Sequence, residues 1–161
     1  MRLVICPGIH SPQFTRGFLT YFLEASSQSP IGRSDLLMLP TECPPYSSLH
    51  VLWFLHNQLQ AEDPAHFLTT PLVFIGFSAG VVGAVGAAWG WQLLGGNVKA
   101  LIALDGWGVP LVGSFPIHRL SHDWFTHWSS AILGAGADSF YADPAVDHLE
   151  LWRLPHTTQG W

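Results

Sequence analysis

Charged residues are scarce in this chain. Only 11% of its 161 residues are charged, with 6 Lys and Arg against 11 Asp and Glu, and the formal net charge is −5. An average globular protein carries about 25% charged residues. Because so few cations leave no basic stripe to neutralise phosphate groups, we expect no nucleic-acid partner. The same shortage disfavours binding to an anionic membrane surface.

Cysteine is scarce too, since the chain contains only Cys6 and Cys43. Two cysteines do not form a disulfide framework of the kind that small secreted proteins use. The first apolar run, residues 2–6, is too short for the hydrophobic core of a signal peptide. Both features predict a cytoplasmic protein.

The chain lacks any charged residue between Phe67 and Val98. Such a stretch is long enough to cross a bilayer. Pro71, the glycines within residues 76–80 and the pair at 95–96 would interrupt a membrane helix. The stretch fits a buried strand, a turn and a buried helix better, so we expect no membrane span.

Apolar and aromatic side chains are abundant. Hydrophobic residues make up 48% of the chain, and it contains 8 Trp and 10 Phe. This composition excludes a disordered chain, and the length suits a single domain, residues 1–161, with one core. Apolar surface left outside that core would suit a substrate pocket or a homodimer interface.

Apolar runs alternate with helical patterns along the sequence. We expect strands at 3–6, 35–39, 72–77, 98–104 and 139–142, and helices at 13–25, 47–61, 79–94, 121–133 and from 147 onward. Three of the strand runs are continuous, as in parallel strands covered on both faces. The alternation predicts an α/β fold with a three-layer, doubly wound, mostly parallel sheet. The aromatic, His-rich segment 106–137 is otherwise irregular and is expected to cover a pocket.

One motif carries chemistry. Residues 76–80 read Gly-Phe-Ser-Ala-Gly, directly after an apolar strand and before a Gly/Ala-rich helical pattern. In this context the G-x-S-x-G motif predicts a nucleophile elbow, in which Ser78 stands on a sharp turn with its hydroxyl exposed. The flanking glycines permit the turn and let helix and strand pack closely. A simpler interpretation is a glycine-rich turn with a bystander serine.

Further chemical groups stand where other strands end, the edge at which parallel sheets bind ligands. A serine nucleophile needs a base to take its proton and a third group to orient that base. Asp105 follows the strand after Ser78 and is predicted to be the orienting acid, with His148 as the base. The alternatives are three more carboxylates and one more histidine: Asp123, Asp143, Asp147 and His156.

The order Ser, Asp, His resembles that of the α/β-hydrolases, and the chain resembles the small thioesterases and short bacterial esterases of that family. Three segments carry the likeness: CPGIHSP at 6–12, GFSAG at 76–80 and FYADPAVDHLELW at 140–152. The first resembles the loop that supplies an oxyanion-hole N–H, and the last resembles the strand and loop that carry the family's histidine. Here residues 146–147 are Val-Asp, where the family usually has a glycine before the acid and His.

The resemblance implies a minimal α/β-hydrolase fold. It also implies an oxyanion hole made by the backbone N–H of Ala79 together with that of Ile9 or His10. We expect aromatic residues of segment 106–137 to line an apolar substrate pocket, namely Trp107, Phe115 and Trp124.

The histidines of the same segment allow a metal hypothesis. His118, His122 and His127, with Asp123, are ligand types for zinc or iron. Their spacings are four and five, and a step of five turns a helical side chain onto another face. We therefore expect no metal here, and the histidines are better explained as part of a pocket-covering helix.

These features predict a serine hydrolase that cleaves a small-molecule carboxylic ester or thioester through an acyl-enzyme and needs no cofactor. The alternative is a catalytically degenerate relative that serves as a binding or assembly module. The chain is short for the fold, with little room for a cap or for all the usual strands, which favours that alternative.

Overall fold

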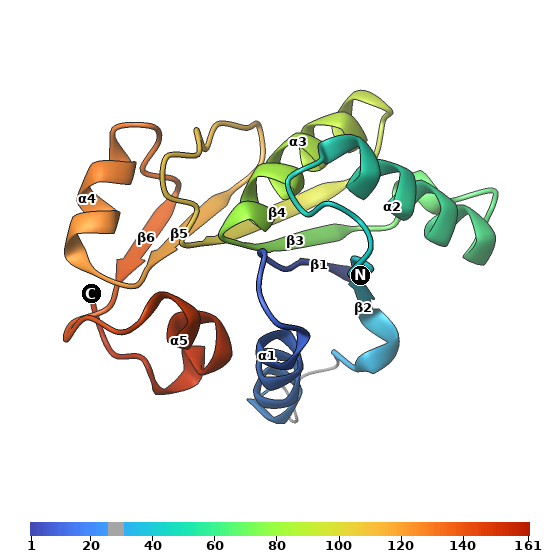
Figure 1. Ribbon diagram of the computed structural model, residues 1–161. Coiled ribbons are helices and arrows are strands. Elements are labelled where there is room, and N and C mark those ends of the chain that lie inside the picture. Colours follow the sequence, from blue (N-terminus) through green and yellow to red (C-terminus); the bar gives the residue numbers. More distant parts are fainter. Residues whose placement is uncertain (26–30) are drawn as a thin grey trace.

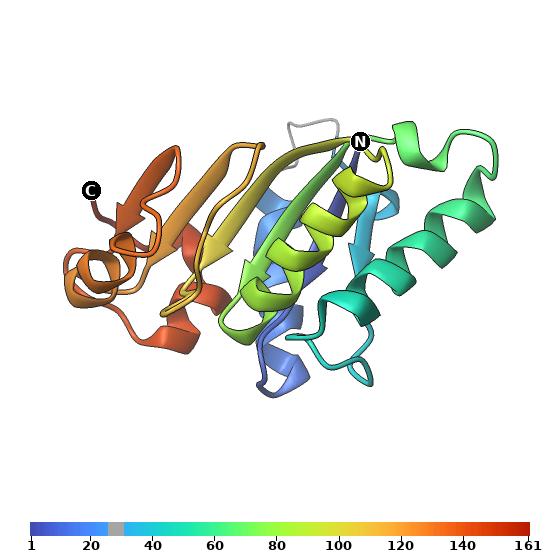
Figure 2. The ribbon, with the colours of Figure 1, turned by 90° about the horizontal axis from the view of Figure 1, so that it is seen from above.

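The computed structural model describes residues 1–25 and 31–161. Within these residues, strands form one sheet in the order β2-β1-β3-β4-β5-β6, seen from above in Figure 2. They are β1 (Arg2–Cys6), β2 (Leu36–Met38), β3 (Leu72–Phe77), β4 (Val98–Leu104), β5 (Ile117–Ser121) and β6 (Asp138–Tyr141). Every neighbouring pair is parallel. All the strands therefore end at the same edge of the sheet.

Helices cover both faces of the sheet. They are α1 (Pro12–Ala25), α2 (Ser48–Glu62), α3 (Ala79–Leu93), α4 (Trp124–Ala131) and α5 (His148–Arg153). In Figure 1, α2 and α3 lie above the sheet, α1 and α5 lie below it, and α4 lies at the upper left beside β5 and β6. The α/β prediction is confirmed, and in the described residues the sheet is wholly parallel.

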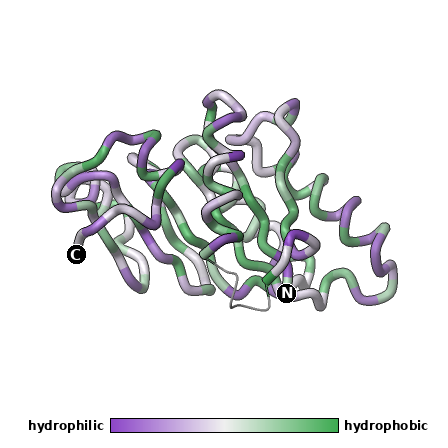
Figure 3. The backbone as a smooth tube through the Cα atoms, turned by 90° about the horizontal axis from the view of Figure 1, so that it is seen from below, coloured by the Kyte–Doolittle hydropathy of each residue, from purple (hydrophilic) through white to green (hydrophobic). Residues whose placement is uncertain are grey.

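Each face of the sheet has its own apolar core. Along β1, Val4 faces α2 and α3, whereas Leu3 and Ile5 face α1 and α5. Because both faces are buried, the strand sequences are apolar at successive positions. Figure 3 shows hydrophobic residues running along the central strands. On the lower face Trp152 is fully buried between α1 and the sheet.

The element predictions differ from the structure mainly in segment 106–137. The strands at 72–77 and 98–104 are confirmed, and α3 ends at Leu93. Residues 117–121, which the sequence pattern left irregular or assigned to a helix, form β5, and α4 begins only at Trp124. The sequence of β5, IHRLS, contains only two apolar residues, so no apolar run marked it. No helix in the described ranges is long and apolar enough to cross a bilayer.

Arg119 explains how so polar a strand is buried. Its side chain is 1% exposed. The guanidinium donates to the carbonyl of Gly134 at 2.8 and 3.2 Å, and to those of Gly106 and Val109 at 3.5 Å. Burial lowers its pKa below the usual value. The charge is thus satisfied by backbone oxygens, and it ties the loop after β4 to β5.

Candidate active site

Ser78 stands on a strained turn between β3 and α3. Its φ is 52° and its ψ is −122°, in a region that costs a non-glycine residue about 1–3 kcal/mol. A Cβ on Gly76 would lie 2.9 Å from Cα of Val81, and one on Gly80 would lie 2.0 Å from the carbonyl oxygen of Cys6. The two glycines therefore allow the turn to close against α3 and β1. The backbone has the conformation that a nucleophile elbow requires.

The loop after β1 packs directly against Ser78. A Cβ on Gly8 would lie 3.0 Å from Cβ of Ser78. Among the described residues, the backbone N–H groups of Ile9, His10 and Ala79 have no hydrogen-bond acceptor. The three predicted oxyanion donors are therefore available, and they belong to segments that meet at the serine.

Asp105 directly follows β4 and has a second positive φ, 51°. Its carboxylate is 1% exposed and accepts three hydrogen bonds. The backbone N–H of His122 donates to Oδ1 at 2.8 Å, and Nδ1 of His122 and of His148 donate to Oδ2 at 2.9 and 2.8 Å. One buried carboxylate thus orients two imidazole rings. Each ring is held through Nδ1. Nε2 of His122 lies 3.7 Å from Oδ2 of Asp123, whereas Nε2 of His148 has no partner among the described residues.

His148 is the first residue of α5. Asp147 caps this helix by accepting the N–H of Leu149 at 2.9 Å. The imidazole stacks on Phe77, the residue before Ser78, with ring centroids 4.7 Å apart. This stacking and the bond to Asp105 bring the ring beside the elbow.

These side chains share one cavity of about 340 Å³. Its polar lining comprises Ser78, Asp105, His122, His148 and Thr126, and Ala79, Val82, Trp107 and Val109 complete it. The structure therefore brings all three residues of the predicted triad to the same cavity. Within the described residues the hydroxyl of Ser78 makes no hydrogen bond, so it is free to meet a ligand there.

His122 is a cavity residue whose contact with Asp105 the sequence interpretation missed, having considered it as a metal ligand or as part of a pocket-covering helix. It follows β5 at the same edge as Ser78 and Asp105. A signal existed, since parallel sheets bind ligands where their strands end, but the polar sequence of β5 hid the strand. The ring centroids of His122 and His148 are 5.8 Å apart.

The alternative acids and base have structural contacts instead. Asp123 caps α4, accepting the N–H of Thr126 at 2.7 Å. Partial burial acts to raise the pKa of Asp123, but the hydrogen bonds from Thr126 and the charge of His122 outweigh it and lower that pKa. Asp143 accepts an indole N–H at 3.2 Å, and exposed His156 stacks on Tyr21 at 4.4 Å. None of these four candidates lines the cavity around Ser78.

The predicted pocket aromatics have different positions. Trp107 lines the cavity and donates its indole N–H to Ser129 at 3.1 Å. Phe115 does not line it, because this residue is 6% exposed in the upper core. Trp124 is 58% exposed on α4, stacked on Trp128. Of the three aromatic residues predicted to line the pocket, only Trp107 lines this cavity.

Two of the three histidines in the metal hypothesis lie apart from the cavity. His118 pairs with Asp138 at 3.1 Å, and His127 lies against Tyr141. A different trio, Asp105, His122 and His148, offers three ligand atoms within 4.8 Å of one another. Two imidazoles and a carboxylate are a suitable donor set for a divalent transition metal.

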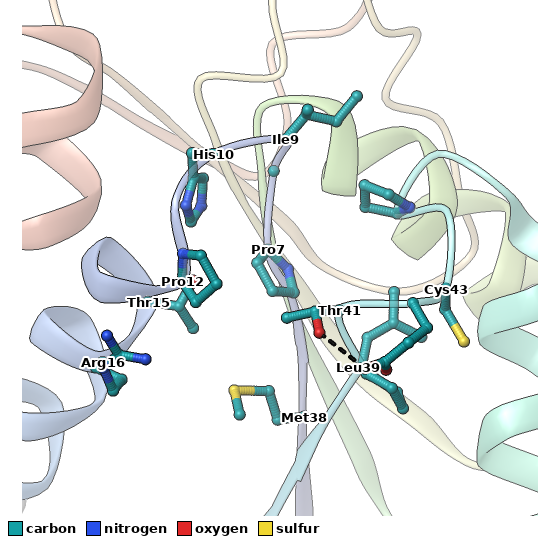
Figure 4. A pocket seen from close by; sticks show the side chains of 14 residues that line it. Pro7, Ile9, His10, Pro12, Thr15, Arg16, Met38, Leu39, Thr41 and Cys43 are labelled. Carbon is teal, nitrogen blue, oxygen red and sulfur yellow. Dashed lines mark hydrogen bonds between the residues drawn. The ribbon is translucent and has the colours of Figure 1, made fainter.

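A larger cavity, of about 750 Å³, lies at the ends of β1 and β2 (Figure 4). It contains neither Ser78 nor Asp105. We place the chemistry in the smaller cavity, because the strained turns and the shared carboxylate are there. No protein-family model matches the chain, and no curated protein matches it significantly.

Proposed function

We propose that this protein is a serine hydrolase with a minimal α/β-hydrolase fold, and that it cleaves a carboxylic ester or thioester. One observation carries the proposal. Ser78, on a strained turn, opens into the same cavity as His148, whose Nδ1 bonds the buried carboxylate of Asp105 at 2.8 Å. The free backbone N–H groups beside the serine support it.

The reaction begins when Oγ of Ser78 attacks the substrate carbonyl and Nε2 of His148 takes its proton. Asp105 holds the imidazole in the required tautomer and stabilises the imidazolium. The N–H of Ala79, with that of Ile9 or His10, stabilises the oxyanion, at about 2.7–4 kcal/mol for each donor.

The tetrahedral intermediate then collapses. The bond from carbon to the leaving oxygen or sulfur breaks, and His148 passes its proton to the leaving group. Water, deprotonated by the same histidine, attacks the acyl-enzyme. This step releases the carboxylic acid and restores Ser78.

The deciding experiment compares Ser78→Ala with Ser34→Ala, a change at an exposed serine. We expect Ser78→Ala to abolish both hydrolysis of p-nitrophenyl or acyl-CoA esters and covalent labelling by a fluorophosphonate. Ser34→Ala should retain both. Undiminished turnover in Ser78→Ala would reject the proposal. A folded wild-type protein that is neither labelled nor active would favour the binding or assembly module.

A second candidate, a metal-binding protein, rests on Asp105, His122 and His148. The carboxylate oxygen lies 2.8 and 2.9 Å from the two Nδ1 atoms. Tetrahedral ligands at about 2.0–2.1 Å from zinc would be about 3.3–3.4 Å apart, so the two Nδ1 atoms would each move about 0.5 Å from the carboxylate oxygen to admit the ion. Calorimetric titration of Zn²⁺ into Ser78→Ala distinguishes the candidates. The metal-binding candidate predicts tight binding of one ion, loss of that binding in His122→Asn, and wild-type activity that depends on the metal. Wild-type turnover that is independent of Zn²⁺ favours the serine hydrolase.

A further inference from the structure

Two cavities flank Ser78 along the edge where the strands end. The smaller one lies over the ends of β4 and β5, with Asp105, His122 and His148 in its wall. The larger one lies over the ends of β1 and β2. Because β3 stands between β1 and β4, Ser78 is between the two cavities. A substrate that reacts at Ser78 can therefore extend in two directions.

The larger cavity has a mostly apolar wall built from three segments. In Figure 4, Thr15 and Arg16 of α1 lie on the left, Leu39 and Cys43 lie on the right, and Pro7 and Met38 lie between them. The apolar part of the wall is Pro7, Ile9, Pro12, Met38, Leu39, Pro40 and Pro45. Ile9 is 74% and Met38 is 44% exposed. Exposed apolar side chains around a cavity favour an apolar ligand.

This cavity begins beside the candidate nucleophile. Gly8 belongs to its wall, and a Cβ on Gly8 would lie 3.0 Å from Cβ of Ser78. Ile9 and His10, whose N–H groups are candidate oxyanion donors, also belong to the wall. A carbonyl held at those donors would have one substituent directed toward this cavity.

We propose that the larger cavity binds the acyl group of the substrate, a neutral apolar chain or ring of medium size. This inference rests on the proposed hydrolase function. His148 must protonate the leaving group, so the leaving group lies on the side of β4, in the smaller cavity. The acyl group then lies on the opposite side of the serine, over β1 and β2.

Size and charge define the acyl group further. A cavity of about 750 Å³ is within the range of about 300–1,000 Å³ that holds drug-sized ligands, and an acetyl group would leave most of it empty. Arg16 and Glu42, of opposite charge, both belong to the wall. Together they favour neither an anionic nor a cationic acyl group.

The first test varies one half of the substrate at a time in wild type, Met38→Trp and the control Leu93→Trp, a change at the far end of α3. With p-nitrophenol as the constant leaving group, we expect wild type to prefer octanoyl over acetyl esters. Met38→Trp should lower kcat/KM for octanoyl esters about tenfold or more while sparing acetyl esters. Leu93→Trp should match wild type. Two results would overturn the proposal: a wild-type kcat/KM that does not depend on the acyl chain, or a Met38→Trp effect that changes with the leaving group and not with the acyl group.

The second test needs no catalysis. Cys43 lines the larger cavity, whereas Cys6 is fully buried and burial raises its pKa to about 12. In Ser78→Ala, iodoacetamide should modify Cys43 and spare Cys6, and octanamide, unlike acetamide, should slow that modification. Unprotected Cys43 counts against the acyl site even where Ser78 is the nucleophile. Protected Cys43 in a protein that a fluorophosphonate does not label would keep the binding site and reject the hydrolase.

Discussion

At the scale of single residues, Asp105 organises the site. Its carboxylate receives Nδ1 of both His122 and His148, and its positive φ turns the chain out of β4 so that the carboxylate faces them. With asparagine at this position, the side-chain oxygen could still accept the backbone N–H of His122. The NH₂ group would then face the two Nδ1–H groups that Oδ2 accepts in the wild type. The two rings would then lose their common acceptor.

We therefore expect Asp105→Asn to lower kcat by about 10³–10⁴-fold, as a wrong tautomer does in a catalytic triad. KM should change little, and fluorophosphonate labelling of Ser78 should slow in parallel. Steady-state kinetics and intact-protein mass spectrometry measure both effects. Asp147→Asn, which alters only the cap of α5, is the matched control. A variant with near-normal kcat would remove Asp105 from the triad.

At the scale of elements, α3 packs against α2 through glycines. A Cβ on Gly83 would lie 2.0 Å from the carbonyl oxygen of Pro45, just before α2, and one on Gly90 would lie 3.0 Å from Cδ2 of Leu52. The first obstacle is backbone, whereas the second is the end of a flexible side chain. The two positions therefore differ in what a methyl group would displace.

This difference predicts opposite effects for one substitution on the same helix. Alanine in a helix interior is favoured over glycine by about 0.5–1 kcal/mol. Gly90→Ala should retain that gain, because Leu52 can rotate away. Gly83→Ala should lose about 1–3 kcal/mol to overpacking, and it should disturb Pro45 in the larger cavity. Urea unfolding measures the stability of both variants. Equal stabilities would show that the backbone at Pro45, before α2, shifts at little cost.

At the scale of the whole molecule, the sequence predicts most of the architecture because the central strands are buried on both faces. Runs such as 72–77 and 98–104 are apolar at every position or nearly so, and no helix fits them better. The sequence does not predict β5, because this strand contains the charged Arg119. Arg119 is buried only because the fold brings backbone carbonyl groups to its guanidinium. His122, which follows β5, is missed for the same reason.

The residues of the candidate site also differ in how far the sequence predicts their positions. Ser78 and Asp105 could be placed at one edge from sequence, because parallel strands end together. The position of His148 depends on tertiary packing, since α5 has only six residues and touches the sheet through side chains distant in sequence. The large cavity likewise arises from three segments that no local pattern links.

Trp152 connects those distant parts. Its indole stacks on Phe18 of α1 at 4.0 Å and on Phe77 of β3 at 5.1 Å, and its N–H reaches Thr15 at 3.3 Å. The same Phe77 carries the ring of His148 on its face. One aromatic stack therefore holds α1, β3 and α5 together, and it fixes the position of His148.

We expect Trp152→Ala to lower the free energy of unfolding by about 3–5 kcal/mol. It should also slow fluorophosphonate labelling of Ser78 under conditions where the variant is folded, because α5 no longer holds His148 over Phe77. Trp152→Phe keeps an aromatic ring in the stack but loses the bond to Thr15 and leaves a small cavity, so it should lose about 2 kcal/mol and label normally. Trp53→Ala, at an exposed indole, should change neither. Labelling that is unchanged in folded Trp152→Ala would mean that Asp105 alone positions His148.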